Sequence, residues 1–236
     1  MGIIGIVAAL TIPQLIKNYQ AHILRNQLKT AYADLNNASR IFMLHNDISV
    51  SEYASLNGTK KAIQKFKKEF TTVVKDDDLD ASSVDDDGKR VEPYKMYLLT
   101  GAEGGWLCDN SGYFWDAQVR TISFDDEPAM GQNGPKVCID INGIKKPNKF
   151  GVDYFVFMFT VDGLVIPFGQ AYKNNPRTFE DGGNLWTNAT VAKPEDFCKV
   201  HWDPRYQLAC SNFALVDKHP TNPRKDYWRD FISEKQ

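Results

Sequence analysis

The hydrophobic positions divide the chain into an apolar beginning, a long amphipathic stretch and a region of alternating pattern. From Gly2 to Ile16 there is no charged residue, and further apolar positions recur at steps of three to five as far as Phe42. This spacing places apolar side chains on one face of a helix. We expect one helix from about Gly2 to His45, roughly 65 Å long, in which Pro13 would allow a bend. Such a helix is longer than a small domain, so its apolar first half is expected to project and to need a lipid or partner-helix environment.

A second, shorter helix is predicted over Ser51–Val74, with Thr59 as its N-cap. Its apolar stripe consists of Ala62, Ile63, Phe66 and Phe70. Lysines occupy the polar faces of this stretch, which is typical of a solvated amphipathic helix or, alternatively, of a basic anion-binding face.

The run Asp76–Asp87 contains seven aspartates and is expected to be a surface loop, because dense like charges repel. A calcium-binding loop is the alternative there, although the alternate spacing and the closing glutamate are missing.

From Tyr94 onward the apolar pattern has a period of two, and β-forming residues predominate. The stretch Tyr154–Val161 is almost entirely apolar, so we expect a central strand covered on both faces, one of them by the long helix. Asp162-Gly163 follows it and predicts a hairpin with a two-residue type I′ turn. The predicted strands are Tyr94–Leu99, Val119–Phe124, Val137–Ile141, Tyr154–Val161 and Leu164–Phe168.

These elements predict an α+β fold in which a long N-terminal helix packs on an antiparallel sheet. We divide the chain into that helix, residues 1–47, and a globular domain, residues 48–236, whose C-terminal region from Gly182 to Gln236 is rich in loops. The total of 236 residues suits one sizeable domain with an extension, or at most two small domains.

Composition and motifs argue against several classes of function. The net charge of −2 favours neither nucleic acid nor an acidic membrane as a partner. The sequence contains no G-x-S-x-G, H-E-x-x-H, phosphate-binding-loop or dinucleotide signature, and none of its four histidines neighbours a clear nucleophile. We therefore assign no catalytic residue and expect a protein that is not an enzyme.

The apolar beginning carries a specific pattern, Gly2-Ile-Ile-Gly-Ile-Val-Ala-Ala-Leu-Thr-Ile-Pro13. It resembles the second half of the N-terminal signature of type IV pilins and type II secretion pseudopilins, in which Pro13 matches the helix-kinking proline. In that family a basic leader ending in glycine and a Phe-Thr-Leu-x-Glu segment come first, and both would lie upstream of Met1. We therefore expect this sequence to be a fragment or to have a late start. The apolar run is short of the roughly 20 residues that a bilayer requires, and the upstream residues would complete the span.

The resemblance implies a pilin-like fold and a structural subunit of a type II secretion pseudopilus or a type IV pilus-like filament. The implied partners are other pilin-like subunits, the inner-membrane assembly platform, the membrane itself and, for the full-length precursor, the prepilin peptidase. The protein would cross the bacterial inner membrane once, with its globular domain in the periplasm or outside the cell. The residues expected to anchor it in membrane and filament are Ile3, Ile4, Ile6, Val7, Leu10, Ile12, Pro13, Leu15 and Ile16.

The stretch from Asp140 to Asp153 is the most distinctive polar motif. It resembles a D-x-N-G-x-x-x-P-N-x-x-G-x-D loop of pseudopilin-like proteins, and the major pseudopilins hold calcium in a loop near the sheet, though with a different ligand pattern. Hard oxygen donors at short spacing suit Ca²⁺. The alternative is a structural loop in which asparagine and aspartate bond to their own backbone. The candidate calcium ligands are Asp140, Asn142, Asn148 and Asp153.

Four cysteines are consistent with two disulfides in an oxidising envelope compartment. Sequence alone allows three pairings, and we favour Cys108–Cys138 in the sheet region and Cys198–Cys210 in the C-terminal loop. A zinc site is the alternative, although its spacing matches no familiar finger. Its ligands would be Cys198, His201, Cys210 and His219.

Two further functions share the same anchor. One is a minor pilin or adhesin-type binding module, for which Trp186, Trp202 and Trp228 are candidate partner anchors unless they only pack loops onto the sheet. The other is an anchored envelope enzyme, which would require a convergent polar cleft. The family resemblance also implies a cysteine-containing strand at Ala209–Val216, followed by a polar turn and the aromatic ending Lys225–Trp228.

Overall fold

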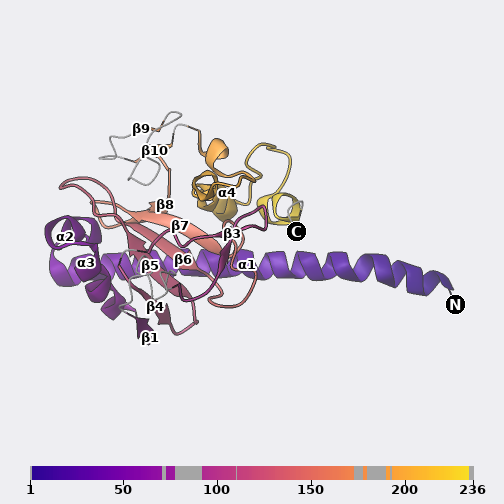
Figure 1. Ribbon diagram of the computed structural model, residues 1–236, viewed down its shortest axis with the longest axis horizontal. Helices are drawn as coiled ribbons and strands as arrows, with labels where there is room; N and C mark the ends of the chain where they lie inside the picture. The colour runs from indigo at the N-terminus through magenta and orange to yellow at the C-terminus, as the bar shows by residue number, and fades with distance from the viewer. Residues whose placement is uncertain are drawn as a thin grey trace, which may run out of the picture.

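The computed structural model shows a globular part from which one long helix projects (Figure 1). An α+β fold with an N-terminal helix and an antiparallel sheet is confirmed. The structure describes residues 2–70, 73–77, 92–109, 111–172, 178–179, 190–191 and 193–233. The description is limited to the backbone for residues 2–10, 14, 74–77, 178–179 and 190–191.

Helix α1 (Gly2–Asn46) is a single helix of 45 residues, as the apolar spacing predicts, with Pro13 inside it. The second half of α1 packs on the sheet through side chains that recur every three or four positions, the period of one helix face. Asp47 follows with a φ of 60°, a left-handed conformation that ends the helix. The core-facing side chains, each at most 3% exposed, are Leu28, Ala31, Leu35, Ala38 and Phe42.

The predicted second helix is in fact three consecutive helices: α2 (Val50–Asn57), α3 (Thr59–Phe66) and the 3₁₀ helix η1 (Lys67–Glu69). Gly58, with a φ of 89°, separates α2 from α3, because this backbone conformation cannot continue an α-helix. The N-cap prediction for Thr59 is wrong, since this residue is already helical and its side chain makes no cap. The capping side chain is that of Ser49, whose hydroxyl accepts a 3.1 Å hydrogen bond from the Glu52 N–H.

Six antiparallel strands form the main sheet, in the order β1-β4-β5-β6-β7-β8. From β4 to β8, strands that follow one another in sequence are also neighbours in the sheet, so short connections suffice. The strands are β1 (Val73–Asp77), β4 (Tyr113–Asp116), β5 (Thr121–Asp125), β6 (Lys136–Asp140), β7 (Tyr154–Phe159) and β8 (Val165–Pro167). Two pairs of short strands lie outside this sheet: β2 (Met96–Tyr97) with β3 (Glu103–Gly104), and β9 (Thr178–Phe179) with β10 (Thr190–Val191).

Four of the five predicted strands are confirmed as β5, β6, β7 and β8, with small shifts at their ends. The fifth, Tyr94–Leu99, shrinks to the two residues of β2. Strands β1 and β4 were not predicted, and β1 covers residues that the sequence pattern assigned to the second helix and to the acidic loop. The rest of that acidic run, Asp78–Asp87, lies outside the described residues.

The hairpin between β7 and β8 is confirmed, but its turn differs from the predicted type I′. The Gly163 N–H donates to the Thr160 carbonyl at 3.1 Å, so Val161 and Asp162 occupy the centre of the turn. Positive φ within this turn is confined to Gly163, at 80°. A turn followed by one left-handed glycine is the usual three-residue hairpin loop. Glycine is also required for space, because a Cβ here would lie 2.6 Å from the sulfur of Met43 on α1.

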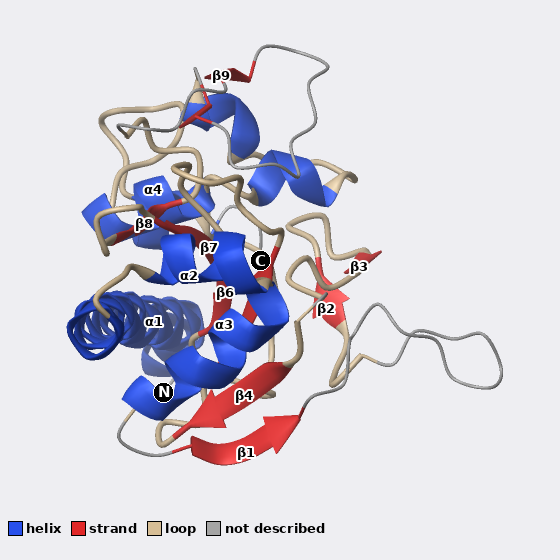
Figure 2. Ribbon diagram, turned by 90° about the vertical axis from the view of Figure 1, so that its left-hand side faces the viewer, coloured by secondary structure: helices blue, strands red, loops and turns tan. Residues whose placement is uncertain are grey.

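Strand β7 is covered on both faces, as predicted, and all six of its residues are buried. On one face Phe155, Phe157 and Phe159 join α1, α2 and α3 in the main core, where Tyr32 stacks on Phe157 with 5.4 Å between ring centroids. On the other face Tyr154 joins a second apolar cluster. Figure 2 views α1 nearly end-on, with α2 and α3 in front of the sheet. The predicted apolar stripe of α3 joins the main core through Ala62, Ile63 and Phe66, with Phe70 packed against it.

One amide on α1 completes the outer edge of β8. Asn36 Oδ1 accepts a 2.9 Å hydrogen bond from the Val165 N–H, and Asn36 Nδ2 donates to the Val165 carbonyl at 3.2 Å. The side chain thus pairs with the strand as a neighbouring strand would, which fixes the helix along the sheet edge.

The described part of the C-terminal region contains loops, as expected, and also several short helices. The strand implied for Ala209–Val216 is wrong, because Cys210–Val216 forms helix α4. The Ser211 hydroxyl on α4 donates a 2.7 Å hydrogen bond to the Val156 carbonyl and so ties this helix to β7. The remaining elements are the 3₁₀ helices η2 (Pro194–Phe197) and η3 (Pro204–Gln207) and the π-helix η4 (Tyr227–Phe231).

Candidate assembly surface and neighbouring sites

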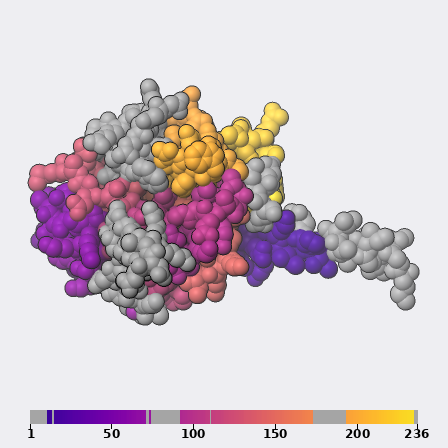
Figure 3. Space-filling view, in the orientation of Figure 1, coloured from indigo at the N-terminus to yellow at the C-terminus, as the bar shows by residue number. Residues whose placement is uncertain are grey.

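The projecting half of α1 presents large apolar side chains to solvent. Ile12, Leu15, Ile16 and Tyr19 are each at least 50% exposed, whereas Leu28 on the same helix is fully buried. Figure 3 shows this part of the helix standing clear of the globular part. Single exposed apolar residues are ordinary on a soluble protein, but a continuous stretch of them marks an interaction surface. We call the exposed residues Ile12, Leu15, Ile16 and Tyr19 the apolar tip.

The predicted anchor residues fall into two groups. Ile12, Pro13, Leu15 and Ile16 lie exposed on the projecting helix. Within the described part of the chain, no helix has both the length and the apolar character needed to cross a membrane. For the other anchor residues the backbone is helical and the side chains lie outside the described residues: Ile3, Ile4, Ile6, Val7 and Leu10.

A groove of about 330 Å³ lies where α1 leaves the globular part. One wall is α1 from Gln20 to Gln27, and the other is formed by residues of the loop between β6 and β7, including Lys145 and Lys146. Both lysines are exposed, and the preceding Ile144 is 61% exposed. The sequence predicts no role for Ile144, Lys145 and Lys146, because no local pattern shows that their loop returns to the helix.

The two aspartates of the predicted calcium loop are fully buried and hydrogen-bonded. Asp153 accepts hydrogen bonds from the backbone N–H groups of Asn148, at 2.9 Å, and Lys149, at 2.5 Å. Asp140 accepts one from the Asn142 N–H at 3.2 Å. Its Oδ2 atom lies 3.1 Å from the Tyr94 hydroxyl. These bonds close the loop in the way that the structural alternative expects.

Burial dominates the electrostatics of this pair. It raises the pKa of Asp153 to about 7, against the opposing effect of the backbone N–H groups. Burial, reinforced by the nearby Asp153 charge, raises the pKa of Asp140 well above its usual range. Among the described residues, no three histidine, cysteine, aspartate or glutamate side chains gather to hold a metal ion. Calcium binding, which would also need the oxygens of Asn142 and Asn148, stays a prediction.

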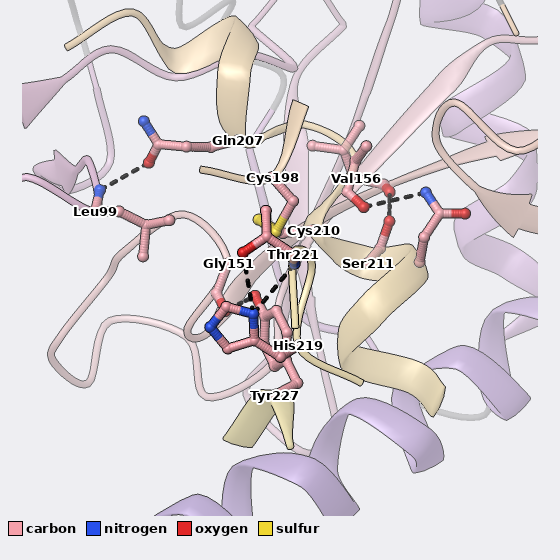
Figure 4. The surroundings of a disulfide bond; sticks show 12 residues. Leu99, Gly151, Val156, Cys198, Gln207, Cys210, Ser211, His219, Thr221 and Tyr227 are labelled. Atoms are coloured by element: carbon pink, nitrogen blue, oxygen red, sulfur yellow. Dashed lines mark hydrogen bonds between the residues drawn. A yellow bond between two sulfur atoms is a disulfide. The ribbon is translucent and has the colours of Figure 1, made fainter. Parts of the chain in front are cut away.

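Both favoured disulfides are confirmed, Cys108–Cys138 and Cys198–Cys210. All four cysteines are therefore oxidised, and the zinc alternative at Cys198 and Cys210 is wrong. Figure 4 shows the second disulfide among hydrogen bonds that tie the C-terminal region to the rest of the fold. Tyr227 donates from its hydroxyl to the Gly151 carbonyl at 2.6 Å, and the Gln207 side chain accepts from the Leu99 N–H at 2.7 Å.

The two described C-terminal tryptophans, Trp202 and Trp228, do not share one exposed patch. Trp228 is 3% exposed, and its indole N–H donates to the Ala214 carbonyl, so it belongs to the core. Trp202 is 75% exposed and stacks on His201. Trp186 lies outside the described residues.

A polar cleft of about 300 Å³ lies between α1 and the turn after β4, the feature that an enzyme would need. Its central cation, Arg120, is buried and forms ion pairs with Asp116 at 2.5 Å and Asp34 at 2.7 Å. Glu69, also in the lining, contacts His45 Nδ1 at 2.9 Å. The described lining thus includes two carboxylates, of Asp34 and Asp116, that are paired with Arg120, and it contains no serine, cysteine or histidine.

Comparison of the chain with protein-family models, with curated proteins and with solved structures gives no match.

Proposed function

We propose that the protein is a structural subunit of a pilin-like filament, of the type II secretion pseudopilus or type IV pilus kind, and acts by assembly rather than catalysis. The apolar half of α1 would hold the subunit in the membrane before assembly. In the filament it would pack against the same half of neighbouring subunits. Association by a rotation that does not close produces a helical filament, with the globular part facing outward.

The observation that supports this proposal is the change of environment along α1. From Leu28 to Phe42 the apolar face is covered by the protein's own sheet. From Ile12 to Tyr19 equally apolar side chains are exposed on a helix that continues without a break. Since exposed apolar surface is unfavourable in water, the second group requires a cover from outside the chain. The cover could come from lipid before assembly and from other helices afterwards.

The test is self-association of the full chain after dilution from detergent, followed by sedimentation velocity and negative-stain microscopy. Leu15→Lys is expected to reduce the assembled fraction at least tenfold, because a charge buried between helices costs several kcal/mol. Leu44→Lys is the matched control, since Leu44 is 77% exposed at the other end of the same helix. It should assemble like the wild type. Assembly of Leu15→Lys at the wild-type level, with an unchanged circular dichroism spectrum, would contradict the proposal.

A further inference from the structure

The end of the globular part from which α1 emerges combines exposed cations with an exposed apolar side chain. Lys145 and Lys146 lie on the rim of the groove beside α1, and Ile144 precedes them at 61% exposed. Lys17, also exposed, follows the uncharged stretch of α1 directly. Long lysine side chains can keep their charge in a polar layer while their stems lie along apolar surface.

The spacing along α1 places these lysines at a definite depth. Ile23, in the groove, lies four residues after Tyr19, the last residue of the apolar tip, which corresponds to about 6 Å of helix. The polar layer on each side of a bilayer is roughly 5–8 Å thick. If the apolar tip enters hydrocarbon, the loop carrying Lys145 and Lys146 therefore comes level with the lipid headgroups.

The neighbouring C-terminal segment adds little opposing charge. Figure 1 shows the last described part of the chain, drawn in yellow, beside the point where α1 leaves the domain. There Asp217 forms a 2.8 Å ion pair with Arg25 of α1. Asp226 and Asp230 both contact Arg229. The described carboxylates of this segment are thus engaged by cations and oppose the charge of the exposed lysines only weakly.

We infer that the surface formed by Ile144, Lys145 and Lys146 docks onto the anionic phospholipid headgroups of a membrane. The phosphates would lie against the two lysines, and Ile144 would enter the boundary of the acyl chains. This inference rests on the proposed insertion of the apolar tip and adds a preference for lipid charge. The net charge of the whole chain does not reveal this preference, because it depends on the fold bringing the loop of Lys145 and Lys146 to the end where α1 emerges.

The test is flotation of the full chain with vesicles of phosphatidylcholine alone or with 30 mol% phosphatidylglycerol. The wild type should bind both and prefer the anionic vesicles. The double variant Lys145→Gln/Lys146→Gln should lose roughly 30-fold in affinity for the anionic vesicles and nothing for the neutral ones. This loss corresponds to about 1 kcal/mol for each lysine near an anionic surface.

The matched control is Lys60→Gln/Lys61→Gln, which removes two adjacent exposed lysines from α3 at the opposite end of the molecule (Figure 1). It should bind anionic vesicles within twofold of the wild type. Equal binding of the wild type to both vesicles would overturn the inference while leaving insertion of the apolar tip intact. Equal losses in the two double variants would also overturn it, by showing that only total charge matters. Failure to bind either vesicle would overturn insertion, and this inference with it.

Discussion

Two buried carboxyl groups, on Asp140 and Asp153, lie at either end of the loop between β6 and β7. An aspartate in the unfolded chain has a pKa near 3.9, whereas burial raises the pKa of Asp153 in the fold to about 7. Between these two pH values the folded state therefore binds more protons than the unfolded state. The stabilisation from the protonated carboxyl is complete below about pH 4 and is lost as the pH rises through about 7.

We expect the free energy of unfolding to fall between pH 5 and pH 8 by an amount on the order of a few kcal/mol. Asp140→Asn, which cannot ionise, should reduce this fall. Asp196→Asn, at an exposed aspartate, should leave it unchanged. Urea titrations at both pH values, in EDTA and then in calcium, measure the effect. A rise in the free energy of unfolding from pH 5 to pH 8 in EDTA would contradict this prediction. A gain in stability at pH 8 on adding calcium would support calcium binding by the loop.

At the scale of elements, the position of α1 on the sheet depends on one amide as well as on the apolar face. Asn36 bonds to both backbone groups of Val165, so its loss leaves two polar groups at the edge of β8 without this partner. An unsatisfied buried backbone group costs about 1–3 kcal/mol.

Asn36→Ala is therefore expected to lower the free energy of unfolding by about 1–3 kcal/mol, measured by urea denaturation. Asn26→Ala is the matched control, because Asn26 is exposed on the same helix and its amide contacts only His22, four residues earlier, among the described contacts. Its loss should cost less than about 0.5 kcal/mol. Equal effects of the two substitutions would show that the hydrogen bonds between Asn36 and Val165 do not contribute to stability.

At the scale of the whole molecule, the two halves of α1 should contribute unequally to stability. The described side chains before residue 20 are exposed, and the first fully buried side chain of the helix is Leu28. A chain beginning at Gln20 should therefore melt within about 2 °C of the full chain. A chain beginning at Tyr32 also loses Leu28 and Ala31, and its melting temperature should fall by more than about 5 °C. Circular dichroism melts of the full chain and of the two truncated chains measure these shifts. A large fall in the melting temperature of the chain beginning at Gln20 would mean that the projecting half stabilises the fold.

The features that could be predicted from the sequence are those with a local cause. The apolar spacing from Leu28 to Phe42 defines α1 because helix periodicity is a local property. Strand β1 was missed because its charged residues Lys75, Asp76 and Asp77 do not resemble a strand, and its pairing partner β4 lies almost forty residues away. The same limit applies to the candidate sites. The residues of the apolar tip lie close together in the sequence, whereas the meeting of Lys145 with α1 results from the fold.

The continuity of α1 has a mechanical consequence. One ladder of backbone hydrogen bonds runs from the projecting half into the half that lies on the sheet. A pull on the free end is therefore transmitted along the helix axis to the row of side chains from Leu28 to Phe42. These side chains share the load in shear and must slide together, instead of peeling away one after another. A protein held by this end would resist extraction better than one held through a flexible linker.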